Sequence, residues 1–294
     1  MNRARSYLFV PGSNKEVIRK AIHSKADSVI LDLEDAVAVK EKDSAREIVK
    51  EALIKFRDEK ELIVRINDLD TPFWEKDLIC ALSNGAAGIM VPKSESCEGM
   101  RAVCEIAREY STNQLKPVQV IPLIETAKGI QFAYSIATSD ELIVRMAFGS
   151  IDFSLDIDCE LTTNGLELLF ARSQLIIASR AAGIGAPIDT VYPKLDNEAG
   201  LEMEAKLAKQ LGFKGKLIIH PKQIEAVHQT FSASQKEIDQ ALAVVEAFEN
   251  AEQNGIASIM VNSQFVDYPV YKKAKNIVID SELNIRNIKI KNKG

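Results

Sequence analysis

The chain contains 294 residues, of which 46% are hydrophobic and 27% are charged. This balance is typical of a globular protein with a sizeable core and excludes a disordered or fibrous chain. The formal net charge is only −5, and Lys and Arg are spread along the chain. We therefore expect no binding surface for nucleic acid or for membranes.

The sequence also argues against export and membrane insertion. The apolar run from Tyr7 to Val10 stops at Pro11 and Gly12, far short of the apolar region of a signal peptide. No later stretch holds the roughly 18 uninterrupted apolar residues of a membrane helix. The four cysteines form no Cys-x-x-Cys pair, which is typical of reduced thiols. We predict a cytoplasmic protein.

Short apolar runs alternate with longer stretches of helical periodicity along most of the chain. Such alternation predicts parallel strands joined by helices, and about eight strands are what an α/β TIM (β/α)8 barrel requires. A doubly wound open sheet is the alternative fold. The expected strands are 7–10, 28–33, 62–66, 87–91, 118–124, 143–148, 187–191 and 216–219.

Helices are predicted between these strands from their start signals and apolar stripes. Thr71 before Pro72 places a capping hydroxyl ahead of a proline at the first helical position. A second helix is expected to end near Gly183 and to pack on the barrel through an apolar face. That face consists of Leu166, Leu169, Phe170, Ile176 and Ile177.

The alternation stops after the eighth strand. Ser234 and Glu237 form a capping-box signature, and apolar residues then recur at helical spacing as far as Phe248. Residues 255–266 are expected to be extended, and Pro269 opens a final short helix. We predict a barrel domain over residues 1–231 and a C-terminal helical arm or lid over residues 232–294.

Polar residues follow most of the expected strands, at the end of a barrel where active sites lie. Many of them are acids, and converging carboxylates repel one another unless a cation lies among them. Each acid alone could instead form a salt bridge or a helix cap, which we favour for Asp32 and Asp189. The strand ends are Asp32 to Asp35, Arg65 to Asn67, Pro92-Lys93, Glu125-Thr126, Gly149 to Asp152, Asp189 and His220-Pro221.

Carboxylates without Cys and with little His favour a hard divalent cation, Mg²⁺ or alternatively Mn²⁺, over Zn²⁺. We predict Glu125 and Asp152 as the metal ligands. The backbone N–H groups of Gly149 and Ser150 are expected to bind a substrate carboxylate where the strand ends. Arg65 supplies positive charge for an oxygen that becomes anionic.

These residues occur within a series of motifs that resembles one known family. The chain is similar to the citrate lyase β-subunit-like lyases of the HpcH/HpaI aldolase superfamily, which includes malyl-CoA and citramalyl-CoA lyases. Each motif alone is weak, but their common order along most of the chain is specific. The motifs span residues 5–12, 32–37, 65–67, 91–93, 125–129, 148–153, 186–192, 212–216, 218–223 and 266–269.

The resemblance implies a Mg²⁺-dependent carbon–carbon lyase that splits a 3-hydroxyacyl thioester into acetyl-CoA, or a related acyl-CoA, and a 2-oxo acid. Coenzyme A would enter as part of the substrate. Glu125 and Asp152 match the family's metal ligands, and Arg65 matches its oxyanion-stabilising arginine. Asp267 matches a catalytic aspartate that the family takes from the lid of a neighbouring subunit, which predicts a homotrimer or hexamer.

Further residues receive roles from the same resemblance. Asp35 and Glu34 are expected to hold water molecules around the metal. Arg5 and Lys15 lie in the stretch where the family binds the substrate carboxylate and coenzyme A, although an exposed basic residue is the alternative for each. His220 also matches the family, but a buried structural histidine is the preferred interpretation.

The sequence departs from the family pattern after Asp152. Citrate lyase β-subunits usually carry Gly-Gly-x-Arg-Thr there, whereas this chain has Asp156-Ile157-Asp158-Cys159-Glu160-Leu161-Thr162. Without the arginine, one carboxylate of a citryl group would lack a partner, which favours citramalyl-CoA or malyl-CoA. Three alternatives remain open: a citryl-CoA or malyl-CoA lyase, a citrate lyase β-subunit acting on an acyl carrier protein thioester, and a metal-dependent aldolase on free 2-oxo acids.

Overall fold

The computed structural model describes residues 4–111 and 117–291, with side chains up to Ser281. The chain packs as two compact units, Met1–Phe231 and Ser232–Gly294. Among the described residues, no helix combines the length and the apolar character needed to cross a membrane. Each of the four cysteines is a free thiol.

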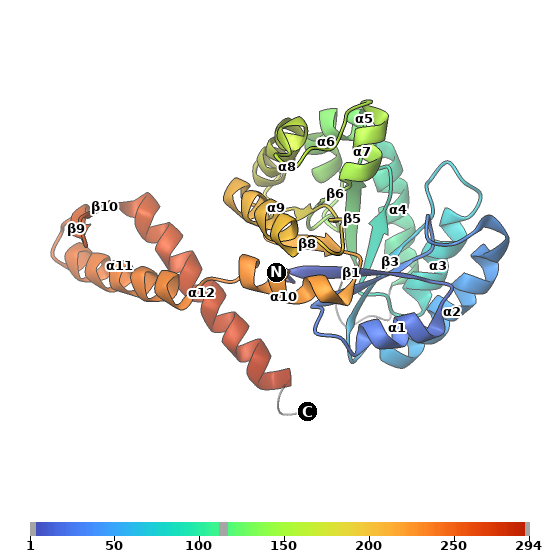
Figure 1. Ribbon diagram of the computed structural model, residues 1–294, viewed down its shortest axis with the longest axis horizontal. Coiled ribbons are helices and arrows are strands. Elements are labelled where there is room, and N and C mark those ends of the chain that lie inside the picture. The colour runs from blue at the N-terminus through green and yellow to red at the C-terminus, as the bar shows by residue number, and fades with distance from the viewer. Residues whose placement is uncertain (1–3, 112–116, 292–294) are drawn as a thin grey trace. The chain divides into compact units, whose positions relative to one another are not determined.

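The first unit is a closed barrel of eight parallel strands in sequential order, with the eighth strand paired to the first (Figure 1). This confirms the (β/α)8 barrel and excludes the open sheet. All eight expected strands are present, although two of them are only two residues long. The strands are β1 (Ser6–Pro11), β2 (Ser28–Asp32), β3 (Glu61–Arg65), β4 (Gly88–Val91), β5 (Gln119–Ile124), β6 (Ala147–Phe148), β7 (Ile188–Asp189) and β8 (Gly215–Ile218).

Helices surround the barrel and bury the outer face of its strands (Figure 1). A smaller apolar cluster, which includes Ile30, Ile63, Ile121 and Leu217, fills the interior. Strands buried on both faces are continuously apolar, so their runs stand out in the sequence. The helices are α1 (Lys15–Ile22), α2 (Lys42–Phe56), α3 (Trp74–Ser83), α4 (Cys97–Tyr110), α5 (Ala127–Gln131), α6 (Ala133–Ala137), α7 (Ser150–Asp156), α8 (Leu169–Ala181), α9 (Glu198–Leu211) and α10 (Ile224–Phe231).

Two helix predictions were wrong in their details. Helix α3 begins at Trp74 rather than at Pro72, because the Thr71 hydroxyl donates to the Asp68 carbonyl, 2.7 Å away, and closes a turn before the helix. The predicted packing face of α8 is largely solvent-exposed, with Phe170 73% accessible and Ile177 63% accessible.

The buried face of α8 instead consists of the small residues Ala171, Ala178 and Ser179, together with Leu175 and the side chain of Arg172. Arg172 is held by Asp189 of β7, whose carboxylate lies 2.8 Å from its Nε and 2.7 Å from the Nζ of Lys216 on β8. Glu204 of α9 completes the cluster, 2.6 Å from Lys216. This confirms the salt-bridge interpretation of Asp189 and explains why α8 turns Arg172 inward.

The second unit is a helical hairpin with a small sheet between its helices. Ser234 and Glu237 form the predicted capping box at the start of α11 (Gln235–Gln253). Antiparallel strands β9 (Ile259–Val261) and β10 (Gln264–Val266) lead into α12 (Tyr268–Lys291). Phe248 stacks on Tyr271 at a centroid distance of 4.7 Å. The final helix has 24 residues and is much longer than expected.

We expect Asp189→Ala to lower the free energy of unfolding by about 3–5 kcal/mol, because it leaves two buried cations without their shared partner. The matched control is Lys206→Ala, which breaks an exposed pair with Glu202 and should cost less than about 1 kcal/mol. Urea unfolding followed by circular dichroism measures both values. Equal losses of unfolding free energy in the two variants would contradict the larger contribution that we assign to the buried cluster.

Candidate active site

The C-terminal ends of parallel strands meet at one end of the barrel, and the predicted site residues of β2, β3 and β5 lie there. Asp32 and Arg65 are register partners at the ends of β2 and β3. The Asp32 carboxylate accepts two hydrogen bonds from the Arg65 guanidinium, both 2.7 Å long. This confirms the salt-bridge interpretation of Asp32 and fixes the plane of the guanidinium.

The remaining nitrogen of Arg65, Nη1, faces the acids that follow β2. It lies 2.8 Å from Glu34 and 3.6 Å from Asp35, and the guanidinium carbon lies 4.9 Å from the ring centroid of Phe9. Burial alone would lower the pKa of Arg65, but the hydrogen bonds and charge of Asp32, followed by Glu34, raise it. Arg65 is therefore a permanent cation with one nitrogen directed at this acidic turn.

Lys93, immediately after β4, connects Glu34 to the next strand. Its Nζ lies 3.0 Å from a Glu34 oxygen and 3.6 Å from Asp68. Its backbone N–H donates to Oε1 of Glu125, 2.9 Å away. Glu34 thus pairs with two cations, Arg65 and Lys93. Burial has the largest effect and raises the pKa of Glu34, although both cations act to lower it.

Glu125 is the most perturbed acid of the cluster. Its side chain is almost fully buried, and burial, followed by the charge of Glu34 and by that of Asp152, raises its pKa to about 8. Gly149 lies against it, and a Cβ at that position would clash with both Oε2 and Cβ of Glu125. Only glycine therefore leaves room for this carboxyl group.

Asp152 lies in the first turn of α7 and is half-buried. It also lines a pocket of about 380 Å³ formed by α7 and the loop after it. Its charge contributes to the raised pKa of Glu125, so the two carboxyl groups interact electrostatically. The two predicted metal ligands thus follow consecutive strands of the barrel, and their joint binding of a metal remains a prediction.

The charge balance of this cluster fits a divalent cation. Within the described residues no group of three or more metal-binding side chains occurs, so a metal here would keep positions for water and substrate. The more buried acids exceed the cations by two, a deficit that one dication would neutralise. The acids are Asp32, Glu34, Asp68, Glu125 and Asp152, and the cations are Lys42, Arg65 and Lys93.

The expectation for the amides of Gly149 and Ser150 needs correction. The Gly149 N–H donates to the Ile124 carbonyl at 3.0 Å, and the Ser150 N–H donates to the Thr190 hydroxyl at 2.9 Å. Both donors are already used in joining β6 to its neighbours, so they do not bind a substrate carboxylate. The role of Gly149 is steric, since it makes space for Glu125.

Arg5 does not lie at this end of the barrel. It precedes β1, forms hydrogen bonds of 2.9–3.2 Å with Asp27, and is separated from Gly12 by the length of a strand, roughly 20 Å. The motif that contains Arg5 therefore spans both ends of the barrel. Lys15, at the start of α1, lies after β1 and pairs with Glu51 on the surface, 2.5 Å away.

Asp267 belongs to the second unit, between β10 and α12. It is half-buried, and its Oδ1 accepts the N–H of Val270 at 3.2 Å. The carboxylate is thus oriented at the start of a helix. Its predicted catalytic role in a neighbouring subunit remains a prediction. His220 is also only half-buried and caps a 3-10 turn by accepting the Lys222 N–H.

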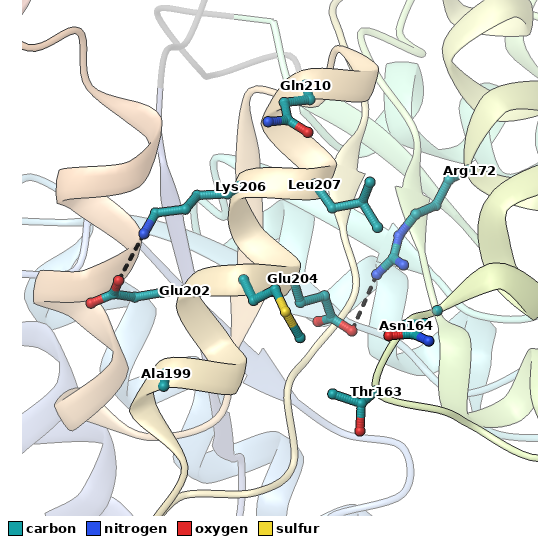
Figure 2. A pocket seen from close by; sticks show the side chains of 11 residues that line it. Thr163, Asn164, Arg172, Ala199, Glu202, Glu204, Lys206, Leu207 and Gln210 are labelled. Carbon is teal, nitrogen blue, oxygen red and sulfur yellow. Dashed lines mark hydrogen bonds and ion pairs between the residues drawn. The ribbon is translucent and has the colours of Figure 1, made fainter.

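A larger pocket, of about 510 Å³, lies beside α9 and the loop before α8. Figure 2 shows its two ion pairs, Arg172 with Glu204 and Lys206 with Glu202. Each of these acids is paired with a cation, whereas the acids around Glu125 outnumber the cations near them. We therefore assign the chemistry to the strand-end cluster and not to this pocket.

Two family models match the chain. The model described as HpcH/HpaI aldolase/citrate lyase matches residues 5–221, and one described as C-C_Bond_Lyase of the TIM-Barrel fold matches residues 173–283. The chain belongs to the HpcH/HpaI aldolase/citrate lyase family. This confirms the resemblance seen in the sequence, and the protein is a carbon–carbon lyase.

Individual relatives extend over nearly the whole chain. Citrate lyase subunit beta of Haemophilus influenzae is 39% identical, covering 97% of this chain and 99% of that protein. L-malyl-CoA/beta-methylmalyl-CoA lyase of Cereibacter sphaeroides is 32% identical over 95% of each chain. The structure of CitE from Mycobacterium tuberculosis, in complex with magnesium, acetoacetate and coenzyme A, has a TM-score of 0.79 and 28% identity, covering 96% of this chain and 100% of that one.

For this lyase, sequence reasoning gave Lys93 no role although it placed the residue at a strand end. Its two contacts, to Glu34 through the ammonium and to Glu125 through the backbone, depend on the conformation of a single turn. The usable signal was the Val-Pro-Lys sequence directly after an apolar run. Proline cannot continue the regular pairing of a strand, which marks the turn that follows.

In metal-free protein, the stability of the wild type should fall relative to Glu125→Gln as the pH rises from about 5 to 8. The raised pKa of Glu125 means that the folded state keeps a proton which the unfolded chain loses near pH 4.5. Stability is therefore lost as the pH rises through this window, by on the order of 3 kcal/mol. Urea unfolding in EDTA at several pH values measures the difference.

Glu225→Gln is the control for this comparison, since Glu225 is an exposed carboxylate on α10. It should follow the wild type at every pH. A constant difference between wild type and Glu125→Gln from pH 5 to pH 8 would contradict a protonated, buried Glu125.

Proposed function

We propose that the protein is a Mg²⁺-dependent lyase that cleaves a 3-hydroxyacyl-CoA such as citramalyl-CoA to acetyl-CoA and pyruvate. The observation that carries this proposal is the buried Glu125 carboxyl, whose pKa burial and the charges of Glu34 and Asp152 raise to about 8. Its Oε1 accepts the backbone N–H of Lys93. A buried acid cluster with surplus negative charge is suited to bind a hard cation.

Glu125 and Asp152 would hold the cation, and Mn²⁺ could replace Mg²⁺ at such oxygen ligands. When bound, the metal supplies Lewis acidity to the oxygen of the 2-oxo acid. Arg65 offers its Nη1 to the same oxygen, because Asp32 occupies the other edge of the guanidinium. Glu34 and Asp35, both next to Nη1, would orient water and substrate.

Cleavage requires three coordinated changes in the substrate. The hydroxyl passes its proton to solvent water as its C–O bond becomes a carbonyl, the adjacent C–C bond breaks, and the electron pair of that C–C bond passes to the thioester as an enolate. The enolate carbon then takes a proton to give acetyl-CoA. We assign that protonation to Asp267 of a neighbouring subunit, with removal of a methyl proton in the reverse direction.

The loop after α7 supports a small acyl group. Asp156 accepts the Ala127 N–H at 2.7 Å, which fixes the loop beside the turn that follows Glu125. Asp158 and Glu160 are exposed, and residues 156–162 contain no cation. An additional substrate carboxylate would meet negative charge here, which favours citramalyl-CoA or malyl-CoA over citryl-CoA.

A second candidate is a citrate lyase β-subunit that acts on an acyl carrier protein thioester. The 39% identity to citrate lyase subunit beta of Haemophilus influenzae, over nearly the full length of both chains, favours it. The two candidates share the metal site and the C–C cleavage. They differ in the acyl group and in the thiol that carries it.

With Mg²⁺ present, the purified protein should release pyruvate from citramalyl-CoA faster than it releases 2-oxo acid from malyl-CoA or citryl-CoA. Lactate dehydrogenase coupling or mass spectrometry measures the products. EDTA, Glu125→Gln and Asp152→Asn should each lower kcat/KM by about 100-fold or more, since each removes part of the metal site. Glu225→Gln is the matched control and should retain full activity.

Other outcomes identify the alternatives. No product from any of the three coenzyme A thioesters would sink the proposal, and activity only after addition of an acylated carrier protein would establish the second candidate. Cleavage of free 2-oxo acid substrates without any calorimetric signal for acetyl-CoA would indicate an aldolase instead.

The role of Asp267 predicts complementation between inactive variants. Asp267→Ala and Glu125→Gln should each be inactive alone, but mixed oligomers should regain activity, because random mixing leaves about a quarter of the sites with both groups intact if each site combines two subunits. Mixing after reversible dissociation, followed by the pyruvate assay, tests this. Asp267→Ala homo-oligomers with full activity, or mixtures without recovery, would contradict a shared site.

A further inference from the structure

Lys93 has an unusual backbone conformation for a lysine. Its φ is +44°, in the left-handed region that is unfavourable for a residue with a Cβ. It follows β4 directly, after Val91 and Pro92. Such conformations persist where neighbouring contacts hold them in place, and in Lys93 both the main chain and the side chain make such contacts.

The main chain of Lys93 contacts the predicted metal ligand. Its N–H donates to Glu125 Oε1 at 2.9 Å, while the other oxygen, Oε2, lies against Gly149. The left-handed turn therefore fixes one carboxylate oxygen by a hydrogen bond. The hydrogen bond leaves Oε2, on the Gly149 side, as the oxygen for a cation.

The side chain of Lys93 contacts the arginine's partner. Its ammonium binds Glu34 Oε1 at 3.0 Å, and Arg65 Nη1 lies 2.8 Å from Glu34 Oε2. Glu34 is thus held between two cations. Without the ammonium, the negative charge of Glu34 would be balanced mainly by Arg65 Nη1. This is the nitrogen that faces the substrate in the proposed function.

We propose that Lys93 is a positioning residue that joins the two halves of the site: its left-handed main chain orients Glu125 for the cation, and its ammonium holds Glu34 so that Arg65 Nη1 can bind the substrate oxygen. The second half of this inference rests on the proposed lyase function. The first half concerns cation binding alone.

A matched pair of variants separates the two roles. Lys93→Asn and Lys93→Val both remove the ammonium, but asparagine tolerates the left-handed conformation whereas a β-branched residue does not. The probe for the main-chain role is Mn²⁺ alone, titrated by electron paramagnetic resonance. We expect a Kd within about threefold of wild type for Lys93→Asn and at least about tenfold weaker for Lys93→Val.

The ammonium role is tested by steady-state kinetics with the thioester that the wild type cleaves. Lys93→Asn should lower kcat by about 30-fold or more with little change in KM, because Arg65 acts on charge that develops in the transition state. Lys93→Arg keeps the cation and should recover most of that loss. Lys206→Asn, at an exposed pair on α9, is the control and should match wild type in both assays.

The outcomes distinguish this inference from the proposed function. Equal Mn²⁺ affinities for Lys93→Asn and Lys93→Val would overturn the main-chain role, and an unchanged kcat in Lys93→Asn would overturn the ammonium role. A wild type that binds Mn²⁺ but cleaves no thioester would refute the lyase proposal, while the Mn²⁺ comparison would still decide the main-chain role. If Lys93→Val does not fold, Lys93→Gly is compared with wild type instead. Glycine adopts the left-handed turn, so this variant should keep the Mn²⁺ affinity of wild type, and a weaker affinity would overturn the main-chain role.

Discussion

The organisation of the active site depends on one electrostatic constraint: several carboxyl groups are held at the mouth of a buried barrel with too few cations to neutralise them. The barrel imposes this, because parallel strands bring Asp32, Glu34 and Glu125 to the same end. Arg65 and Lys93 offset part of the charge. Burial, followed by the negative charge of Glu34 and of Asp152, raises the pKa of Glu125. A carboxyl group in this state can release its proton and accept a cation with little rearrangement.

The sequence predicted the barrel well because its strands are buried on two faces. Apolar runs such as residues 28–33 and 62–66 do not alternate between apolar and polar residues, as the strands of a sheet with one solvent-exposed face would. The polar residues that follow them were placed correctly for the same reason, since the end of each run marks the end of a strand. Glu125, Asp152 and Arg65 could thus be assigned to one mouth from their order in the chain.

Other features could not be predicted because they depend on contacts between distant residues. The apolar stripe of α8, with Phe170, was expected to face the barrel, but Arg172 on the other side has a partner in Asp189 that periodicity does not reveal. The amides of Gly149 and Ser150 looked available for substrate, yet Ile124 and Thr190 accept their hydrogen bonds. Arg5 begins a motif, residues 5–12, that runs the whole length of β1, so Arg5 lies at the end of the barrel opposite to the active site.

The fold contains a second buried ion cluster, and the comparison shows what distinguishes a structural cluster from a chemical one. Arg172 and Lys216 face Asp189 and Glu204 between β7, β8 and their helices, so two cations meet two anions. There the pKa of Asp189 is lowered, because its two cationic partners outweigh the effect of burial. At the mouth, burial and neighbouring acids raise the pKa of Glu125 instead. Two clusters of similar residues thus shift a buried acid in opposite directions, and only the one with unbalanced charge has a reason to bind a further ion.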